Sequence, residues 1–267
     1  MREKNMGNNI FSLEEKKIVV FGGAGYLGCA AVKAMVDLGA KVVVADMFPD
    51  FENARDRFHE LSKLSGVTLL PCNVDSSEQI RAAYDKCIEL YGGFNAMVNL
   101  VYYGAPANME VMTDEQFECG VSGCVTHQFR AIREAIPYFE KNGGGAIVTT
   151  GSMYGVVSPD PRIYGVSGQN NPVNYGPTKA AVIQLTRYAA GHLADRNIRV
   201  NCVVPGPFPE DKYLPPEEFL RELSHKTMLG RVGKSSEIAG AFCYLVSDAS
   251  SFCTGSTVTV DGGWTAW

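Results

Sequence analysis

A tyrosine and a lysine four residues apart, Tyr175 and Lys179, have the types and the spacing to move a proton. They stand in Asn174-Tyr-Gly-Pro-Thr-Lys179, at the start of a segment predicted to be helical to about Ala194. On a helix, residues at this spacing lie on the same face. A tyrosine hydroxyl titrates near pH 10 in water, and a fixed ammonium beside it favours the phenolate. Such a pair can donate a proton to a ketone or take one from an alcohol. Because this motif occurs often by chance, its meaning depends on the surrounding elements.

Those elements alternate between short apolar runs, typical of buried strands, and segments with helical spacing. The alternation predicts an α/β fold with a doubly wound parallel sheet of about seven strands. We expect a single domain over residues 15–267, after a polar lead-in at residues 1–14. The 113–140 segment is helical in composition but interrupted by Gly120 and Gly123. Strands are expected at 17–21, 41–45, 67–70, 95–101, 145–150, 198–204 and 256–260, and helices through residue 38 and at 52–64, 76–91, 113–140, 175–194, 216–225 and 235–247.

The composition is that of an ordinary globular protein, with 46% hydrophobic and 20% charged residues. A net charge of −5 provides no basic field for nucleic acid or an anionic membrane. We find neither an apolar run of transmembrane length nor a signal-peptide core. Eight cysteines without a Cys-x-x-Cys motif are typical of reduced thiols, which favours a cytoplasmic protein. On a helix Cys119 and Cys124 would point apart, so with His127 they predict no metal site.

Three glycines, Gly22, Gly25 and Gly28, follow the first predicted strand and open a helix. In this arrangement a tight turn and a helix N-terminus hold a pyrophosphate. Asp46 ends the second predicted strand, where a carboxylate accepts hydrogen bonds from ribose hydroxyls and repels a 2′-phosphate. No arginine follows it directly, so NAD is predicted as the cofactor in preference to NADP. The alternatives are a plain turn at the glycines and a solvated or helix-capping role for Asp46.

These motifs continue in the order found in a known enzyme family, with Asn99 after the fourth strand, Ser152 after the fifth and Pro205-Gly206 after the sixth. Over residues 16–264 the chain resembles the short-chain dehydrogenase/reductase family, in its compact form with an atypical glycine loop. The resemblance implies a Rossmann fold and a homodimer or homotetramer. It also implies that Tyr175 exchanges a proton with the substrate, Lys179 supports Tyr175 and holds the nicotinamide ribose, and Ser152 orients the reacting oxygen. The implied cofactor-binding residues are Gly22, Gly25, Tyr26, Leu27, Gly28, Asp46, Asn73, Val74, Asn99, Tyr175, Lys179, Pro205, Gly206 and Phe208.

Several positions depart from the family pattern. Tyr26 stands where the compact branch has its middle glycine, which leaves a Gly-x-x-Gly-x-x-Gly spacing similar to that of the sugar-nucleotide-modifying branch. Tyr102 stands where glycine is normal, and Glu210 where a threonine touches the nicotinamide amide. In such enzymes an asparagine on the fourth helix holds the lysine through a water, and here its position falls on Cys124, whose thiol is a poor substitute for an amide. The remaining departures are Phe21 for threonine and Asn73 for aspartate.

The segment between Ser152 and Tyr175 is longer than usual, and its extra residues, 158–172, are rich in polar side chains. Such a loop suits a hydroxylated substrate, although a solvated loop with turn residues is an equal alternative. We predict an NAD(H)-dependent oxidoreductase that interconverts a secondary alcohol and a ketone on a small polar, sugar- or polyol-like substrate. One alternative is an NAD-using epimerase or dehydratase of a sugar derivative, as the glycine spacing suggests. Another is a dinucleotide-binding protein with little catalysis, as the departures at Tyr102, Cys124 and Glu210 suggest.

Overall fold

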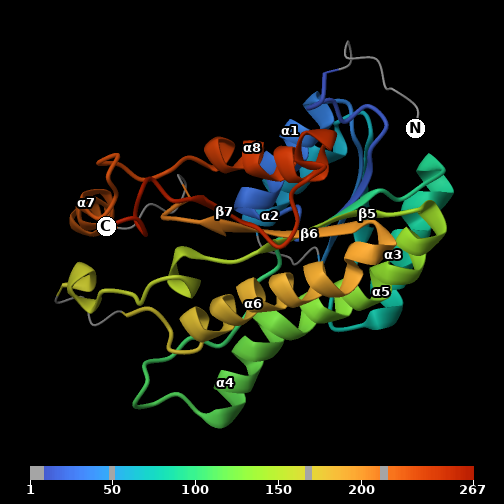
Figure 1. The fold of residues 1–267 in the computed structure, drawn as a ribbon. Coiled ribbons are helices and arrows are strands. Elements are labelled where there is room, and N and C mark those ends of the chain that lie inside the picture. The colour runs from blue at the N-terminus through green and yellow to red at the C-terminus, as the bar shows by residue number, and fades with distance from the viewer. Residues whose placement is uncertain (1–8, 48–51, 166–169, 211–215) are drawn as a thin grey trace.

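The computed structural model describes residues 9–47, 52–165, 170–210 and 216–267. Within these ranges, seven parallel strands form one sheet in the order β3-β2-β1-β4-β5-β6-β7 (Figure 1). The order runs outward from β1 in both directions, which is the doubly wound arrangement and confirms the predicted fold class. The strands are β1 (Lys17–Phe21), β2 (Lys41–Asp46), β3 (Val67–Pro71), β4 (Ala96–Asn99), β5 (Gly145–Thr150), β6 (Ile198–Pro205) and β7 (Thr257–Val260).

Helices cover both faces of the sheet. In Figure 1, α1 and α8 lie above it, and α3, α5 and α6 lie below it. Helix α4 continues the line of α5 away from the sheet, and α7 lies near the C-terminus. The helices are α1 (Tyr26–Asp37), α2 (Glu52–Ser62), α3 (Ser77–Tyr91), α4 (Asp114–Val121), α5 (His127–Asn142), α6 (Tyr175–Leu193), α7 (Glu217–His225) and α8 (Ser235–Val246). None of the helices in the described ranges is both long and apolar enough to cross a membrane.

The residues of β1 alternate between two hydrophobic cores. Ile18 and Val20 pack with α1 and α8, whereas Val19 and Phe21 pack with α3, α5 and α6. This period of two follows from the pleat of a strand that is covered on both faces. Phe21, at the position where the family has a threonine, is fully buried and meets Tyr84 edge-on with 5.7 Å between ring centroids. The two cores fix the sheet, and the carboxyl ends of its strands carry the candidate site.

The expected interruption of the 113–140 helix is a π-helical turn, Ser122–Thr126, that joins α4 to α5 without a break. Its glycine allows a close approach: a Cβ on Gly123 would lie 1.9 Å from the carbonyl oxygen of Tyr103. A Cβ on Gly120 would lie 2.2 Å from the side-chain amide of Asn174. Turns of this kind are frequent at functional sites. The two glycines therefore serve tertiary packing and do not end the helix.

The start of the chain is only partly described, because residues 1–8 of the predicted lead-in lie outside the described ranges. Leu13, near the end of that segment, is fully buried and its N–H donates to the carbonyl of Leu38 over 2.9 Å. The N–H of Ala249 donates to the carbonyl of Ile10 over 3.0 Å. Residues 10–13 therefore pack onto the body of the sheet, and the domain boundary at residue 15 stays a prediction.

Gly28 is the position where we expect an added methyl group to do most damage to the glycine turn. An alanine Cβ there would lie 2.3 Å from the carbonyl oxygen of Gly22. We expect Gly28→Ala to lower the free energy of unfolding by about 1–3 kcal/mol, the range typical of overpacked sites. Urea denaturation measures it. Gly191→Ala in α6 is the control, because nothing lies within 4 Å of its Cβ. It should raise stability by about 0.5–1 kcal/mol, and equal effects of the two variants would contradict the clash.

Candidate active site

The first turn of α6 carries Tyr175 and Lys179 to the carboxyl end of the sheet. Lys179 is 4% exposed, and its ammonium Nζ donates to the carbonyl oxygen of Thr150, the last residue of β5, over 3.0 Å. This hydrogen bond compensates part of the cost of burying the charge. The ammonium lies 5.7 Å from the ring centroid of Tyr175, so the predicted pair is brought together.

Tyr102, in the turn after β4, lies against the same two side chains. Its ring meets that of Tyr175 at 90° with 5.0 Å between centroids. The Lys179 ammonium lies 5.5 Å from the centroid of Tyr102. The sequence marks this position only by its departure from the family's glycine, and no local pattern indicates where the ring lies.

Ser152 follows β5 and caps the short 3₁₀ helix Met153–Gly155. Its Oγ accepts a hydrogen bond from the N–H of Tyr154 over 3.2 Å, which leaves the hydroxyl proton to be donated elsewhere. The 3₁₀ helix packs tightly on the start of α6, since a Cβ on Gly155 would lie 2.7 Å from the carbonyl carbon of Lys179. The buried hydroxyl of Ser152 is therefore held on an element that is itself fixed to the Tyr175 helix.

A buried polar network lies behind these residues. The N–H at Nε2 of His127 donates to the carbonyl of Gly123 over 3.2 Å, because a carbonyl can only accept. Nδ1 therefore accepts from the amide of Asn99, also over 3.2 Å. The other side-chain atom of Asn99, Oδ1, accepts from the N–H of Val101. Asn99, predicted to bind cofactor, thus has its side chain engaged with protein partners in this structure. Gln128 completes the network by donating to the carbonyl of Asn99.

His127 is neutral at physiological pH. Burial, and then the charge of Lys179, lowers the pKa of His127 to about 4. In the unfolded chain His127 binds a proton near pH 6.5. Its contribution to the free energy of unfolding is therefore fully present above that pH and decreases as the pH falls towards 4, by up to about 3 kcal/mol. We expect the His127 ring resonances in NMR spectra to show no titration between about pH 8 and pH 5. The urea-unfolded protein is the control, and a midpoint near pH 6.5 in the folded protein would contradict the assignment.

The glycine turn and the start of α1 present several backbone N–H groups that have no partner within the helix. Gly22 has a φ of 73°, and its carbonyl accepts from the N–H of Gly25 over 3.2 Å. The first helical hydrogen bond is that of Cys29 to the carbonyl of Gly25, so the N–H groups of the three preceding residues have no partner within α1. Tyr26, Leu27 and Gly28 supply those groups, while the Leu27 side chain packs on the core. The geometry suits a pyrophosphate, and cofactor binding by these residues stays a prediction.

A cavity of about 350 Å³ lies beside the ends of β2, β3 and β4. Asp46 stands at its edge, where one carboxylate oxygen accepts from the N–H of Ala24 over 3.0 Å and the other from the N–H of Met47 over 2.8 Å. Burial raises the pKa of Asp46, and these hydrogen bonds oppose that effect. The size and position of the cavity suit the adenosine half of a dinucleotide. It is lined by Asp46, Met47, Cys72, Asn73, Val74, Asp75, Val101, Tyr102 and Tyr103.

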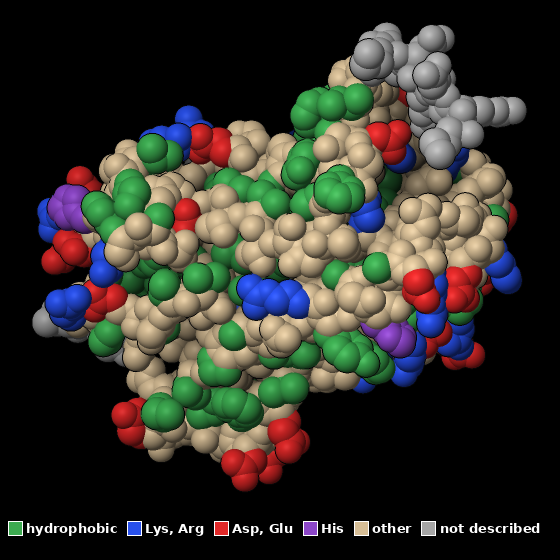
Figure 2. All heavy atoms as spheres, viewed as in Figure 1, with side chains coloured by type: hydrophobic (Ala, Val, Ile, Leu, Met, Phe, Trp, Pro, Cys, Tyr) green, Lys and Arg blue, Asp and Glu red, His purple; other side chains and the backbone are tan. Residues whose placement is uncertain are grey.

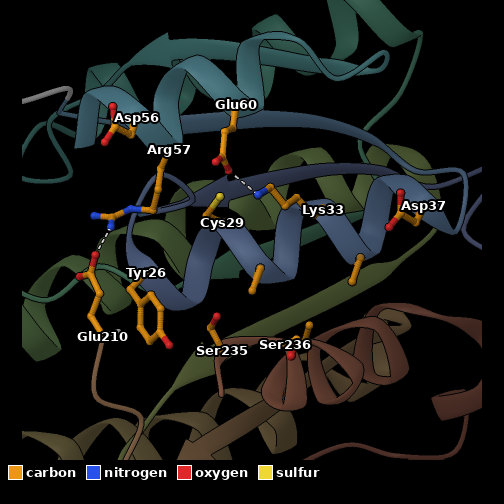
Figure 3. Close-up of a pocket in the computed structure, with 13 residues that line it drawn as sticks. Tyr26, Cys29, Lys33, Asp37, Asp56, Arg57, Glu60, Glu210, Ser235 and Ser236 are labelled. Atoms are coloured by element: carbon orange, nitrogen blue, oxygen red, sulfur yellow. Dashed lines mark hydrogen bonds and ion pairs between the residues drawn. The ribbon is translucent and has the colours of Figure 1, made fainter. Parts of the chain in front are cut away.

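A second cavity, of about 610 Å³, lies between α1, α2 and the start of α8 (Figure 3). Arg57 of α2 lines this cavity. Its Nε donates to the carbonyl of Ala24 in the glycine turn over 2.9 Å, and its Nη1 pairs with Glu210. Glu210, where the family has a threonine, therefore ties the segment after β6 to α2. The ring of Tyr26 points into the same cavity (Figure 3). A second ion pair, Lys33 with Glu60, closes its wall.

The three predicted cofactor-binding residues at the end of β6 and just beyond it are divided between two places. Pro205 ends the strand, and the N–H of Gly206 donates to the carbonyl of Val260 over 2.9 Å. Both lie at the carboxyl end of the sheet. The Phe208 ring instead packs on Gly233, where a Cβ would lie 2.4 Å from it, just before α8. Among the described residues, no three His, Cys, Asp or Glu side chains come together as metal ligands.

The site thus combines a glycine turn at a helix N-terminus with a tyrosine, a lysine and a serine at the carboxyl end of one sheet. Comparisons with known proteins identify the family of the chain. A family model described as "Enoyl-(Acyl carrier protein) reductase" matches residues 23–265. The chain is 33% identical over 254 residues to the 3-oxoacyl-(acyl-carrier-protein) reductase FabG of Thermotoga maritima, covering 94% of this chain and 98% of that protein.

Two further relatives are named as dehydrogenases. The 2,5-dichloro-2,5-cyclohexadiene-1,4-diol dehydrogenase LinX of Sphingobium indicum is 30% identical over 255 residues, covering 94% of this chain and 97% of its own. The L-fucose dehydrogenase of Bos taurus is 30% identical over 260 residues, covering 93% and 88%.

Solved structures resemble the fold over nearly its whole length. A short-chain type dehydrogenase/reductase from Mycobacterium marinum has a TM-score of 0.83 at 29% identity, covering 97% of this chain and 98% of its own. The Pseudomonas aeruginosa RhlG/NADP active-site complex has a TM-score of 0.82 at 25% identity, covering 97% and 99%. The chain therefore belongs to the short-chain dehydrogenase/reductase family and is an oxidoreductase of that family.

Proposed function

We propose that this protein interconverts a secondary alcohol and a ketone with NAD(H), on a small hydroxylated substrate such as a sugar or polyol. The observation that carries the proposal is the fixed Lys179 ammonium, held by the Thr150 carbonyl and 5.7 Å from the ring of Tyr175. Tyr175 is the side chain that would exchange the proton with the substrate, and Lys179 places a fixed positive charge beside it.

The roles of the three side chains follow from their chemistry. In alcohol oxidation, the Tyr175 phenolate takes the hydroxyl proton of the substrate; in ketone reduction, its hydroxyl donates that proton to the carbonyl oxygen. Ser152 donates its hydroxyl proton in a hydrogen bond to the same oxygen and so orients it. The chemistry supplied by a bound nicotinamide is hydride transfer to or from the neighbouring carbon.

The choice of NAD over NADP rests on charge. The Asp46 carboxylate lies at the edge of the 350 Å³ cavity, where a 2′-phosphate would add like charge. Arg57 does not offset it freely, because its guanidinium is paired with Glu210. The NADP in the RhlG complex is a finding about that protein.

The substrate class rests on the loop between Ser152 and α6 and on two relatives. In the described part of the loop, Asp160 pairs with Arg162 and with Lys226, each over 2.8 Å. Gln169 lies outside the described residues. Ile163 joins an apolar cluster against which Tyr175 packs, so the wall is more apolar than the loop composition suggests. An apolar wall with a polar rim suits a cyclic hydroxylated molecule. The names of LinX and the L-fucose dehydrogenase, a diol and a sugar enzyme, point to the same class.

We also propose a homo-oligomer, as the family resemblance implies. Large apolar side chains are exposed on α4, α5 and α6, namely Phe117, Phe129 and Tyr188. Figure 2 shows hydrophobic side chains on the face where α6 lies and gathered further below, at α4. A second copy that covers this face would remove them from water. Sedimentation equilibrium distinguishes a dimer or tetramer from a monomer.

The test of the function has two steps. Calorimetric titration of the purified protein with NADH and NADPH should give tight binding of NADH and weak binding of NADPH. A panel of sugars, sugar acids and cyclic polyols, followed at the NADH absorbance, should then contain a substrate. Binding without turnover on any member would favour the dinucleotide-binding alternative. Dinucleotide that co-purifies, with product but no net NADH, would favour an epimerase or dehydratase. Failure to bind either dinucleotide would overturn the proposal.

A further inference from the structure

Tyr102 lies next to both proton-transfer side chains, at a position where the family has a glycine. We propose that Tyr102 is a positioning residue that holds Lys179 and Tyr175 in their working arrangement. It would perform in this chain the task for which the family uses the asparagine that Cys124 replaces. This proposal rests on the proposed function, because it concerns the same proton transfer.

The Lys179 ammonium lies in a corner-shaped space formed by two aromatic rings and a backbone carbonyl. One side of the corner is the ring of Tyr102, at 5.5 Å, and the other is the ring of Tyr175, at 5.7 Å. The two rings are perpendicular and 5.0 Å apart, an edge-to-face arrangement that favours one orientation of each. The carbonyl of Thr150 closes the corner over a hydrogen bond of 3.0 Å. A lysine side chain has a long flexible stem, so three such contacts restrict it strongly.

Tyr102 acts through its ring and not through its proton. Burial, then Tyr175 and Cys124, raises the pKa of Tyr102 to about 12, so its hydroxyl stays protonated in the range where an alcohol dehydrogenase works. The hydroxyl lies beside Gly104, where a Cβ would approach it to 3.4 Å. Tyr102 is 42% exposed, so it lies at the surface of the site and is not a core residue.

Two further groups near Lys179, one on α5 and one on β6, carry no negative charge that could hold its ammonium. Apart from Tyr175 on its own helix, Lys179 interacts electrostatically with His127 of α5 and with Cys202 of β6. His127 is neutral, since its pKa is lowered to about 4, and burial raises the pKa of the Cys202 thiol. Neither of these groups carries a negative charge at neutral pH. Within the described part of the chain, the two ring faces and the Thr150 carbonyl are in contact with the ammonium.

Three variants separate the ring from the hydroxyl and from the missing asparagine. Tyr102→Phe keeps the ring and should keep kcat within about twofold. Tyr102→Gly, the family's residue, should lower kcat about tenfold or more and move the pH–rate profile to higher pH. Adding Cys124→Asn to Tyr102→Gly restores the family pair and should recover most of that loss. Thermal unfolding of each variant confirms that it folds.

A second measurement does not depend on turnover. In NMR spectra of the ligand-free protein, ring currents should displace the side-chain signals of Lys179, equally in the wild-type protein and in Tyr102→Phe. The displacement should fall in Tyr102→Gly. A Tyr102→Gly variant with unchanged kcat and pH profile would overturn the proposal and leave the proposed function intact. So would a variant that binds NADH more tightly and turns over faster, because Tyr102 would then obstruct the cofactor. Absence of turnover in the wild-type protein would contradict the proposed function, and the NMR comparison would still test the contact.

Discussion

Replacing Tyr175 with phenylalanine is expected to lower kcat by about 10³-fold, within the range that general acid–base catalysis contributes. The affinity for NADH should stay within about twofold, because the substitution removes only the hydroxyl that exchanges a proton with the substrate. The ring is kept, and with it the edge-to-face contact with Tyr102 at 5.0 Å and the flank of Lys179 at 5.7 Å. Steady-state turnover on the best member of the panel, paired with calorimetric titration of NADH, measures both quantities.

Tyr188→Phe provides a matched control on the same helix. Tyr188 is 68% exposed and stacks on His192, on a part of α6 more than two turns beyond Lys179. Losing its hydroxyl should change neither kcat nor NADH affinity. If Tyr175→Phe retained activity comparable to that of Tyr188→Phe, the proton would have to come from another group, and the assignment of Tyr175 would be wrong. If both variants lost NADH binding, the helix and not the hydroxyl would be responsible.

The sheet and the proton-transfer pair can be predicted from the sequence because both depend on local spacing. The run at 17–21 is apolar at four of its five positions, and the structure divides those residues between two cores. Such a run is typical of a strand covered on both faces. Tyr175 and Lys179 lie about one helical turn apart, so their alignment needs only that a helix forms there. The amino-acid sequence alone therefore suffices to predict the fold class and the juxtaposition of this pair.

Contacts between distant segments cannot be predicted in this way. The π-helical turn at Ser122–Thr126 places Gly123 against the Tyr103 backbone, and no local residue preference records that approach. The pairing of Glu210 with Arg57 joins residues that lie far apart in the chain. The same holds for the ring of Tyr102 on Tyr175. The sequence marks Tyr102 and Glu210 as departures from the family pattern. Only the tertiary structure shows which residues these two side chains contact.

Replacing Asp46 with serine is expected to reverse much of the preference for NADH over NADPH. Like charges a few ångströms apart repel by several kcal/mol in a partly buried site, and a carboxylate also makes the stronger hydrogen bonds to ribose hydroxyls. The variant should bind NADPH about tenfold more tightly and NADH about tenfold more weakly, so that the ratio of the two dissociation constants changes about 100-fold. Arg57 remains paired with Glu210 in this variant, so the gain in NADPH affinity comes from the loss of the repelling carboxylate.

Asp75→Ser separates this effect from a general loss of negative charge. Asp75 lines the same cavity, but its carboxylate pairs with Arg130 over 2.7 Å and accepts from the hydroxyl of Tyr103. Its charge is therefore largely offset, and its removal should leave the ratio of the dissociation constants for NADH and NADPH within about twofold. An equal change of the ratio in both variants would mean that the cavity responds to net charge alone. No change in Asp46→Ser would place the ribose away from Asp46, and the preference for NAD would then need another cause.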